Sequence, residues 1–335
     1  MRASFERGDL STWGYGDAYA AAATDPRHLL ADALRVVCVA MPYRTPDPPR
    51  SARAGRVSNY AWSTDYHGTL RAMLTELAAM LDAFAGRAVT RIACDTAPIA
   101  ERAFAARAGL GWIGKHTGLI SPVAGSYVFL GEIVTSLDLP VDPPLKKTCG
   151  SCTRCVAACP TGALRGDYTI DADLCIADLT QRTDPIPREL RPLIGDWVWG
   201  CDLCQGVCPP NARAKTWGSQ KFAPAHTQAA APDLVALLHI RSGEFKRRFR
   251  RTSMGWRGAA VLRRNAAIAL GNLRDGSAVA PLARALANDP HPMVRGAAAW
   301  ALGRIGSPEA ISALQAAARS EQDAGAHSEI VQALQ

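Results

Sequence analysis

The most constraining feature of this chain is a set of eight closely spaced cysteines in its middle third. Residues 149–160 have the sequence CGSCTRCVAACP, with four cysteines at spacings of two, two and three. Residues 200–211, GCDLCQGVCPPN, add three more, and Cys175 lies alone between the two runs. Such a set of thiols can form disulfides, bind zinc or ligate iron–sulfur clusters.

The predicted compartment argues against disulfides. The first thirty residues contain no continuous apolar core of the kind found in secretory signals, and no apolar run approaches the length of a membrane span. We therefore expect a soluble, cytoplasmic protein without a membrane partner, whose thiols stay reduced.

The cysteine count favours two iron–sulfur clusters. Four, one and three cysteines make two complete sets of four, and a proline after each run is typical of bacterial two-cluster ferredoxins, in which the last cysteine of a run ligates the other cluster. Two zinc sites are the alternative. One 4Fe-4S cluster is expected on Cys149, Cys152, Cys155 and Cys208, and the other on Cys159, Cys175, Cys201 and Cys204. Cys38 and Cys94 lie in apolar runs and are expected to be buried as small hydrophobic residues.

Before the cysteines, the chain alternates apolar runs with helical patterns. Residues 35–41, 88–94 and 125–135 are expected to be buried strands, and the periodicity predicts helices over about 70–84 and 98–108. This alternation favours an α/β domain. The expected division is an α/β domain over 1–145, a ferredoxin-like domain over 146–215 and a basic helical domain over 216–335.

Residues 94–120 of the α/β part, CDTAPIAERAFAARAGLGWIGKHTGLI, contain the candidate catalytic group. Asp95 follows an apolar strand, and the simplest reading makes Asp95 or Thr96 the cap of the next helix. The glycine-rich loop after that helix allows close approach to a bulky ligand, although it matches no phosphate-binding pattern. Its polar residues are Lys115, His116 and Thr117. A second polar and aromatic group precedes the first long helix and comprises Ser58, Tyr60, Trp62, Asp65, Tyr66 and His67.

These segments together resemble the epoxyqueuosine reductase family of cobalamin-dependent iron–sulfur enzymes. The resemblance rests on the DYH segment at 65–67, on CDTAPIAERAFAARAGLGWIGKHT and on the two cysteine runs, and it extends from about residue 30 to the end. It implies the reduction of epoxyqueuosine to queuosine at the wobble position of tRNA, with electrons from an external donor. Family members usually carry a longer helical N-terminal segment, which this chain has in shortened form.

The resemblance also implies site residues. Asp95 corresponds to the family's proton donor, and the eight cysteines correspond to its cluster ligands. Cobalamin is expected between the α/β and cluster domains, near Ser58, Asp95, Lys115, His116 and Thr117. An ordinary aspartate is ionised at neutral pH, so a donor at Asp95 requires a raised pKa, which burial would provide.

The C-terminal part contains an internal repeat. Residues 262–286 align with 294–318 at a shift of 32, which pairs Arg263 with Arg295 and Gly271 with Gly303. A helical repeat of this period predicts a HEAT-like domain.

A basic, aromatic segment precedes and overlaps the repeat. The chain has a formal net charge of +8, and nine of its basic residues fall within 241–264. Phosphate contacts with the anticodon stem-loop of tRNA are the expected use, and a solvated face is the alternative. The candidate contacts are Lys246, Arg247, Arg248, Arg250, Arg251, Arg263 and Arg264.

We expect a monomeric enzyme, and two other functions compete with the reductase. A small-molecule reductase similar to reductive dehalogenases would use the same cofactors, but it leaves the basic repeat unexplained. A ferredoxin-type electron carrier would explain the cysteines, but not the domain around Asp95.

Overall fold

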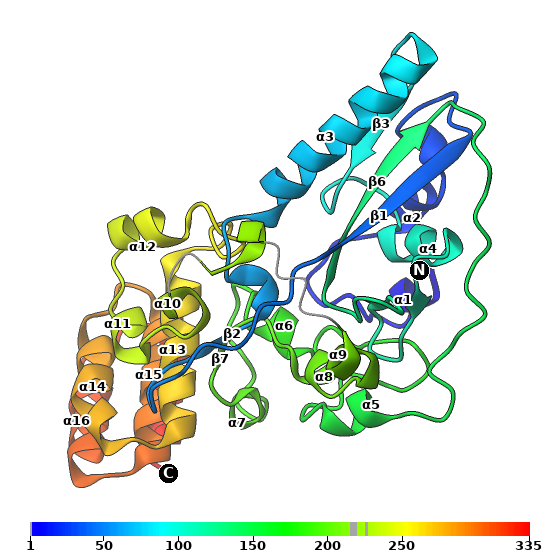
Figure 1. The fold of residues 1–335 in the computed structure, drawn as a ribbon. Coiled ribbons are helices and arrows are strands. Elements are labelled where there is room, and N and C mark those ends of the chain that lie inside the picture. Colours follow the sequence, from blue (N-terminus) through cyan, green and yellow to red (C-terminus); the bar gives the residue numbers. More distant parts are fainter. Residues whose placement is uncertain (1, 215–219, 225–226) are drawn as a thin grey trace. The chain divides into compact units, whose positions relative to one another are not determined.

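Two units make up the computed structural model, which describes residues 2–214, 220–224 and 227–335 (Figure 1). Unit 1 comprises Met1–Pro46, Asp65–Cys175 and Asp202–Ala223, and unit 2 comprises Asp47–Thr64, Ile176–Cys201 and Pro224–Gln335. Both units are discontinuous in the sequence, and the expected ferredoxin-like segment contributes to both. Its short cysteine loops build no separate core. The boundary expected at 215 lies outside the described residues.

A three-stranded antiparallel sheet forms the centre of the α/β part of unit 1. Its strands are β1 (Arg35–Pro42), β6 (Val128–Thr135) and β3 (Thr90–Ala93), in the order β1-β6-β3. Helix α3 (Tyr66–Ala85) packs on the sheet through Leu70 and Leu74, and α4 (Glu101–Arg107) follows β3. The close approach of Leu74 requires glycine at 131, where a Cβ would lie 2.7 Å from the leucine Cδ1. The predicted strands and helices are confirmed, with boundaries shifted by a few residues.

The rest of unit 1 consists of short elements. They are α1 (Arg2–Glu6), α2 (Asp17–Thr24), η1 (Pro26–His28), β4 (Trp112–Ile113), β5 (Leu119–Ile120), α5 (Arg154–Ala158), α8 (Leu203–Gly206), α9 (Pro209–Arg213) and η3 (Gln220–Phe222).

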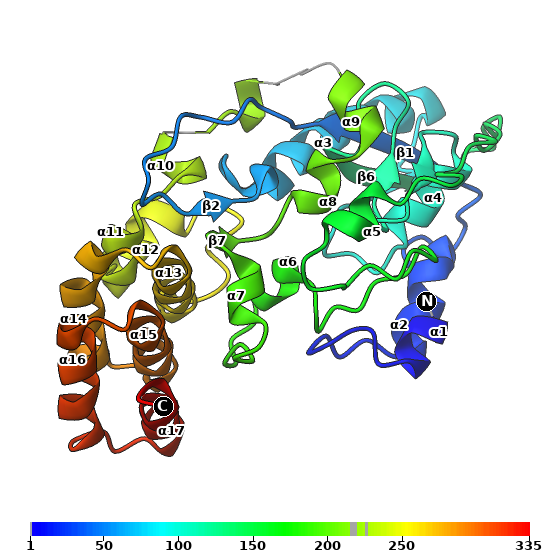
Figure 2. The same ribbon diagram turned by 90° about the horizontal axis from the view of Figure 1, so that it is seen from below.

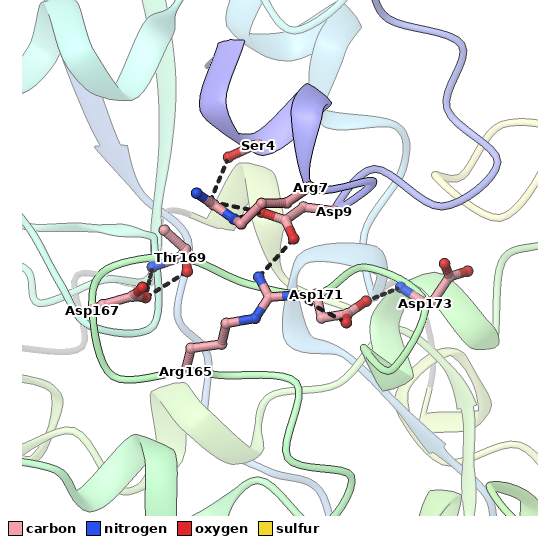
Figure 3. Close-up of polar contacts among 8 residues, drawn as sticks. All are labelled: Ser4, Arg7, Asp9, Arg165, Asp167, Thr169, Asp171 and Asp173. Carbon is pink, nitrogen blue, oxygen red and sulfur yellow. Dashed lines mark hydrogen bonds and ion pairs between the residues drawn. The ribbon is translucent and has the colours of Figure 1, made fainter.

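The N-terminal segment is fastened to the loop between Cys159 and Cys175 (Figure 3). Asp9 is only 2% exposed and accepts from Arg165 at 2.6 Å, while Arg7 lies 2.8 Å from its other carboxylate oxygen. The backbone NH of Ala172 donates to the carbonyl of Asp9 at 2.9 Å. The short N-terminal segment therefore helps to fix one of the loops that end at a candidate cluster ligand.

Unit 2 is mainly helical. Its elements are β2 (Arg56–Val57), η2 (Asn59–Ala61), α6 (Ile176–Leu179), α7 (Arg191–Ile194), β7 (Trp197–Trp199), α10 (Thr227–Ala230), α11 (Leu234–Leu238), α12 (Ser242–Phe249), α13 (Ala259–Leu273), η4 (Gly276–Ala278), α14 (Val279–Asn288), α15 (Pro292–Ile305), α16 (Pro308–Ala318) and α17 (Ala324–Ala333). Helices α13, α15 and α17 form one layer and α14 and α16 the other (Figures 1 and 2). Among the described residues, no helix combines the length and apolar character needed to cross a bilayer.

The sequence repeat is explained by helix packing in this layer. A Cβ at Gly271 would lie 2.8 Å from Ala301, and one at Gly303 would lie 2.8 Å from the carbonyl oxygen of Ala333. The two glycines therefore occupy equivalent crossings, of α13 with α15 and of α15 with α17. The paired positions Leu270 and Leu302 are both fully buried. The HEAT-like prediction is confirmed.

Filling the first crossing should destabilise unit 2. We expect Gly271→Val to lower the free energy of unfolding by about 1–3 kcal/mol, since overpacking forces the two helices apart. Gly276→Val is the control, because a Cβ at Gly276 would meet nothing within 4 Å. Urea unfolding followed by circular dichroism measures both. Equal stability of the two variants would contradict the packing argument.

Candidate functional site

Asp95 lies at the end of β3 in a strained conformation. Its φ is 49°, a left-handed value that non-glycine residues rarely adopt. Its backbone NH donates to Glu101 Oε1 at 2.5 Å, and its half-exposed carboxylate lies 2.9 Å from His67 Nε2. The helix-cap interpretation is wrong, because α4 begins after Ala100 and no side chain caps it. Strain of this kind is common at functional sites.

His67 is held between two carboxylates. Asp65 caps α3 by accepting from the backbone NH of His67, and its carboxylate also lies 2.5 Å from His67 Nδ1. The imidazole stacks on Tyr66, whose ring lies parallel to Phe129 of β6 at 3.9 Å. These contacts fix the ring so that its second nitrogen faces Asp95.

The two acids determine where the proton of this group resides. The hydrogen bond with Asp95, together with Asp65, raises the pKa of His67 to about 9. The same bond from His67 lowers the pKa of Asp95, although burial opposes the shift. The expected raised pKa of Asp95 is therefore wrong. At neutral pH the proton lies on His67, and Asp95 is its ionised partner.

Two further carboxyl groups lie on this part of unit 1, and our sequence reasoning missed both. Burial raises the pKa of Glu101 to about 7. Glu132 of β6 is completely buried, and neither of its carboxylate oxygens has a hydrogen-bond partner among the described residues. Burial raises the pKa of Glu132 to about 9, with a contribution from Glu101. The signal was available in the sequence, since a glutamate interrupts the apolar strand FLGEIVT.

The glycine-rich segment forms a β-hairpin between β4 and β5, with Lys115, His116 and Thr117 in its turn. Thr117 has a φ of 65°, and its carbonyl accepts from Arg102 of α4 at 2.7 Å. His116 is buried. Its Nδ1 accepts from the backbone NH of Gly118, and its Nε2 has no partner among the described residues. Burial lowers the pKa of His116 and favours a neutral ring with the proton on Nε2.

Lys115 connects this hairpin to the first cysteine run, because its Nζ donates to the carbonyl of Gly150 at 2.9 Å. Within that run, Cys152 is exposed and Cys155 is buried. Burial raises the pKa of Cys208 to about 11, with further contributions from Cys149, Cys155 and Cys152. The structure therefore brings the last cysteine of the second run to three cysteines of the first.

The second expected set is brought together in part. Burial raises the pKa of Cys204 to about 12, with contributions from Cys175, Asp202, Cys155 and Cys159. Cys201 is the last residue of the middle segment of unit 2. Among the described residues, no group of three Cys, His, Asp or Glu side chains is arranged to hold a single metal ion.

A buried asparagine fixes the second cysteine run within unit 1. The side chain of Asn211 donates to the carbonyl of Gln205 at 2.7 Å and accepts from the backbone NH of Ser126 at 2.6 Å. The contact is so close that a Cβ at Gly125 would lie 2.0 Å from the asparagine oxygen. The peptide between Cys204 and Cys208 is thus tied to the segment that enters β6.

The remaining predicted cofactor contact, Ser58, belongs to unit 2. It is buried, and its backbone NH donates to the carbonyl of Trp199 at 2.8 Å, next to the pairing of β2 with β7. Its neighbour Trp62, counted with the polar aromatic group, is a core residue that is 3% exposed and donates to the carbonyl of Val57.

The basic segment forms helix α12 and the turn that follows it. Phe245 and Phe249 are buried on one face. Five basic side chains of the segment are exposed, and they are Arg241, Lys246, Arg247, Arg250 and Arg251. Arg248 differs, because it is half-buried and pairs with Glu244 at 3.0 Å.

Two of the predicted tRNA contacts are wrong. Arg263 is buried and pairs with Asp289 at 2.6 Å, and its repeat partner Arg295 pairs in the same way with Glu321 at 2.6 Å. Arg264 is 1% exposed and donates to backbone carbonyls, and burial lowers its pKa to about 9. Neither side chain is available to a phosphate, because both are used to hold the fold.

Comparison with protein families matches three parts of the chain. Residues 24–96 match "Epoxyqueuosine reductase QueG, DUF1730", residues 148–211 match a 4Fe-4S double cluster binding domain, and residues 258–335 match HEAT repeats.

Individual relatives match nearly the whole chain. The epoxyqueuosine reductase of Bacillus subtilis is 39% identical over 310 residues, which are 91% of this chain and 80% of that protein. A crystal structure of epoxyqueuosine reductase with an epoxyqueuosine-modified tRNA stem loop is 36% identical, with a TM-score of 0.92 over 99% of this chain and 89% of the other. Another, from Bacillus subtilis, has its catalytic aspartate loop swung out of the active site. It is also 36% identical, with a TM-score of 0.91 at the same coverage.

The buried Glu132 should make stability depend on pH. Its carboxyl group stays neutral in the folded protein up to pH about 9, whereas it ionises near 4.5 when unfolded. Wild type should therefore lose stability relative to Glu132→Gln as pH rises from 4.5 towards 9. Melting temperatures at pH 5 and pH 8 test this, with exposed Glu76→Gln as the control. A difference between Glu132→Gln and wild type that is the same at both pH values would contradict it.

Proposed function

This chain belongs to the epoxyqueuosine reductase family, and we propose that it reduces epoxyqueuosine to queuosine at the wobble position of tRNA. The observation that carries the proposal is the pair formed by His67 and Asp95, which holds one proton at the exposed end of β3. The hairpin of Lys115, on the same unit, contacts the first cysteine run. The proposed proton source and the first cysteine run thus lie on the same unit.

The eight cysteines are proposed to ligate two 4Fe-4S clusters. As is typical of bacterial two-cluster ferredoxins, the last cysteine of each run would ligate the other cluster. The first set is supported by the approach of Cys208 to the first run. The second is supported by the approach of Cys204 to Cys159 and Cys175, with Cys201 as its fourth member three residues before Cys204. Buried thiols with pKa values of 11 to 12 are unfavourable as thiolates, and bound iron offsets that cost.

The residues of the hairpin fit the cobalamin that the family implies. His116 Nε2, which has no partner among the described residues, offers a buried donor, and the half-buried turn beside it can lie close to a large planar ligand. We propose that Lys115, His116, Thr117 and Asp95, all of unit 1, hold cobalamin. When bound, cobalamin supplies a low-valent cobalt able to open the strained epoxide.

The protein's own groups supply the proton for the departing oxygen. Reduction of an epoxide to an alkene consumes two electrons and two protons and releases water. His67 is protonated at neutral pH, and Asp65 stabilises the imidazolium. Through Asp95 the pair can give that one proton to the departing oxygen, which leaves His67 neutral, and the second proton is taken from solvent. The pair thereby replaces the neutral carboxylic acid expected from the sequence.

The substrate surface is proposed to be the exposed basic face of α12. Arginine and lysine side chains on one side of a helix suit phosphates spaced along an anticodon stem. We further propose that the enzyme is monomeric and cytoplasmic and takes its electrons from an external carrier.

Loss of the carboxylate at Asp95 should abolish turnover without loss of cofactors. Asp95→Asn can still accept from His67 but holds no charge, so conversion should fall about 10²–10⁴-fold. In wild type the rate should decline as pH rises through about 9, where His67 loses its proton. Mass spectrometry of tRNA nucleosides measures conversion. Asp142→Asn, exposed on the same unit, is the control, and near-wild-type turnover of Asp95→Asn would overturn the role.

Removal of the basic face should weaken tRNA binding. Neutralising Arg247, Arg250 and Arg251 should reduce the slope of log affinity against log salt by roughly 2 to 3. A charge-matched control neutralises the exposed Arg274, Arg284 and Arg319 elsewhere in unit 2 and should leave the slope unchanged. Filter binding of an anticodon stem-loop at several salt concentrations measures both. Equal slopes would mean that α12 is only a solvated face.

A further inference from the structure

Two adjacent side chains of the HEAT-like helix α13 hold the peptide that joins two candidate cluster ligands. This peptide, 176–200, lies wholly in unit 2, between Cys175 and Cys201. Arg264 donates to the carbonyls of Leu179 at 3.0 Å, Arg182 at 2.9 Å and Asp184 at 2.6 Å. The guanidinium therefore holds the segment that directly follows Cys175.

Asn265 holds both ends of the same peptide at once. Its amide nitrogen donates to the carbonyl of Thr180 at 2.7 Å and to that of Val198 at 2.8 Å. Its oxygen accepts from Arg264 Nε at 2.9 Å, which fixes the orientation of the amide. Asn265 is 2% exposed, so water offers no substitute for these bonds.

A third contact joins the two ends directly. The backbone NH of Gly200 donates to Thr180 Oγ1 at 2.9 Å, inside the protein. Gly200 has a φ of 66°, and a Cβ there would lie 2.6 Å from Ser58 Cβ, so the chain must take this close turn immediately before Cys201. Helix α6, which begins at Ile176, leads from Cys175 to Thr180.

We propose that Asn265 and Arg264 are positioning residues for the second iron–sulfur cluster, acting through the peptide that carries Cys175 and Cys201. The proposal rests on the proposed cluster ligands. Residues that orient metal ligands without touching the metal commonly change metal affinity about 10–100-fold when removed. By this arrangement a helix of the repeat domain sets the geometry of a redox centre, in addition to building the repeat.

Helix α13 itself provides the matched control. The side chain of Asn272 also donates to two backbone carbonyls of this peptide, those of Arg191 and Gly195, each at 2.8 Å. Asn265→Ala and Asn272→Ala therefore remove the same kind of contact from the same helix. Of these two asparagines, Asn265 is the one that binds both ends of the peptide, at Thr180, five residues after Cys175, and at Val198, three residues before Cys201.

The test is chelator-induced iron release from the reconstituted full-length protein. Asn265→Ala should lose one of its two clusters about tenfold faster than wild type, with a changed electron paramagnetic resonance signal for that cluster. Asn272→Ala should release iron as wild type does. Equal rates for the two variants, or loss of both clusters together in Asn265→Ala, would overturn the proposal.

A milder variant covers the case in which Asn265→Ala does not fold. Thr180→Val keeps the shape of the side chain but removes the acceptor of the Gly200 NH, together with the donation of the hydroxyl to the carbonyls of Ile176 and Ala177 within α6. It should also accelerate release from one cluster. Wild-type kinetics in a folded Thr180→Val would count against the proposal. Cys175→Ala distinguishes a wrong role for Asn265 from a wrong assignment of the cluster ligands. That variant should lose one cluster whatever the role of Asn265. Iron release is measured without enzyme turnover.

Discussion

The loops that carry the candidate cysteine ligands are too short to bury an apolar core of their own, and this constraint shapes both units. The loops between the candidate ligands are held by buried polar side chains. In unit 1, Asn211 ties the second cysteine run to Ser126, and Asp9 with Arg165 fixes the loop before Cys175. In unit 2, Asn265 does the same for the peptide before Cys201. Directional hydrogen bonds replace the hydrophobic packing that such short segments cannot provide.

Hydrogen bonding also explains how the candidate acid is arranged. A lone buried aspartic acid would keep its proton through desolvation, as Glu132 does in the strand beside it. Asp95 is half-exposed and hydrogen-bonded to the His67 imidazolium, so the ionised form of Asp95 is favoured. The proton of the pair is held on His67, across that hydrogen bond. A pair of this kind delivers a proton without keeping a neutral acid at a solvent-accessible position.

The elements that the sequence predicted well are those with local causes. Cysteine spacing and helical periodicity depend on near neighbours, so α3 and the approach of Cys208 to the first cysteine run could be anticipated. The charge state of Asp95 could not, because it depends on His67, 28 residues away. The burial of Arg264 depends on carbonyls more than 80 residues distant. The grouping of distant segments into two compact units could not be anticipated either, because it depends on contacts between residues far apart in the sequence.

Arginines in the basic segment illustrate how one residue type serves two purposes. On α12, buried Phe245 and Phe249 fix one face, and Arg247 remains exposed, as do Arg250 and Arg251 just after the helix. On α13, Arg263 finds an acid 26 residues later, and Arg295 repeats that spacing on α15. The repeat therefore identifies structural arginines, because an arginine that recurs with its acidic partner holds the fold, whereas the exposed Arg247, Arg250 and Arg251 lie outside the aligned repeat. A count of charges alone does not distinguish exposed from structural arginines, but the repeat spacing and the acidic partner do.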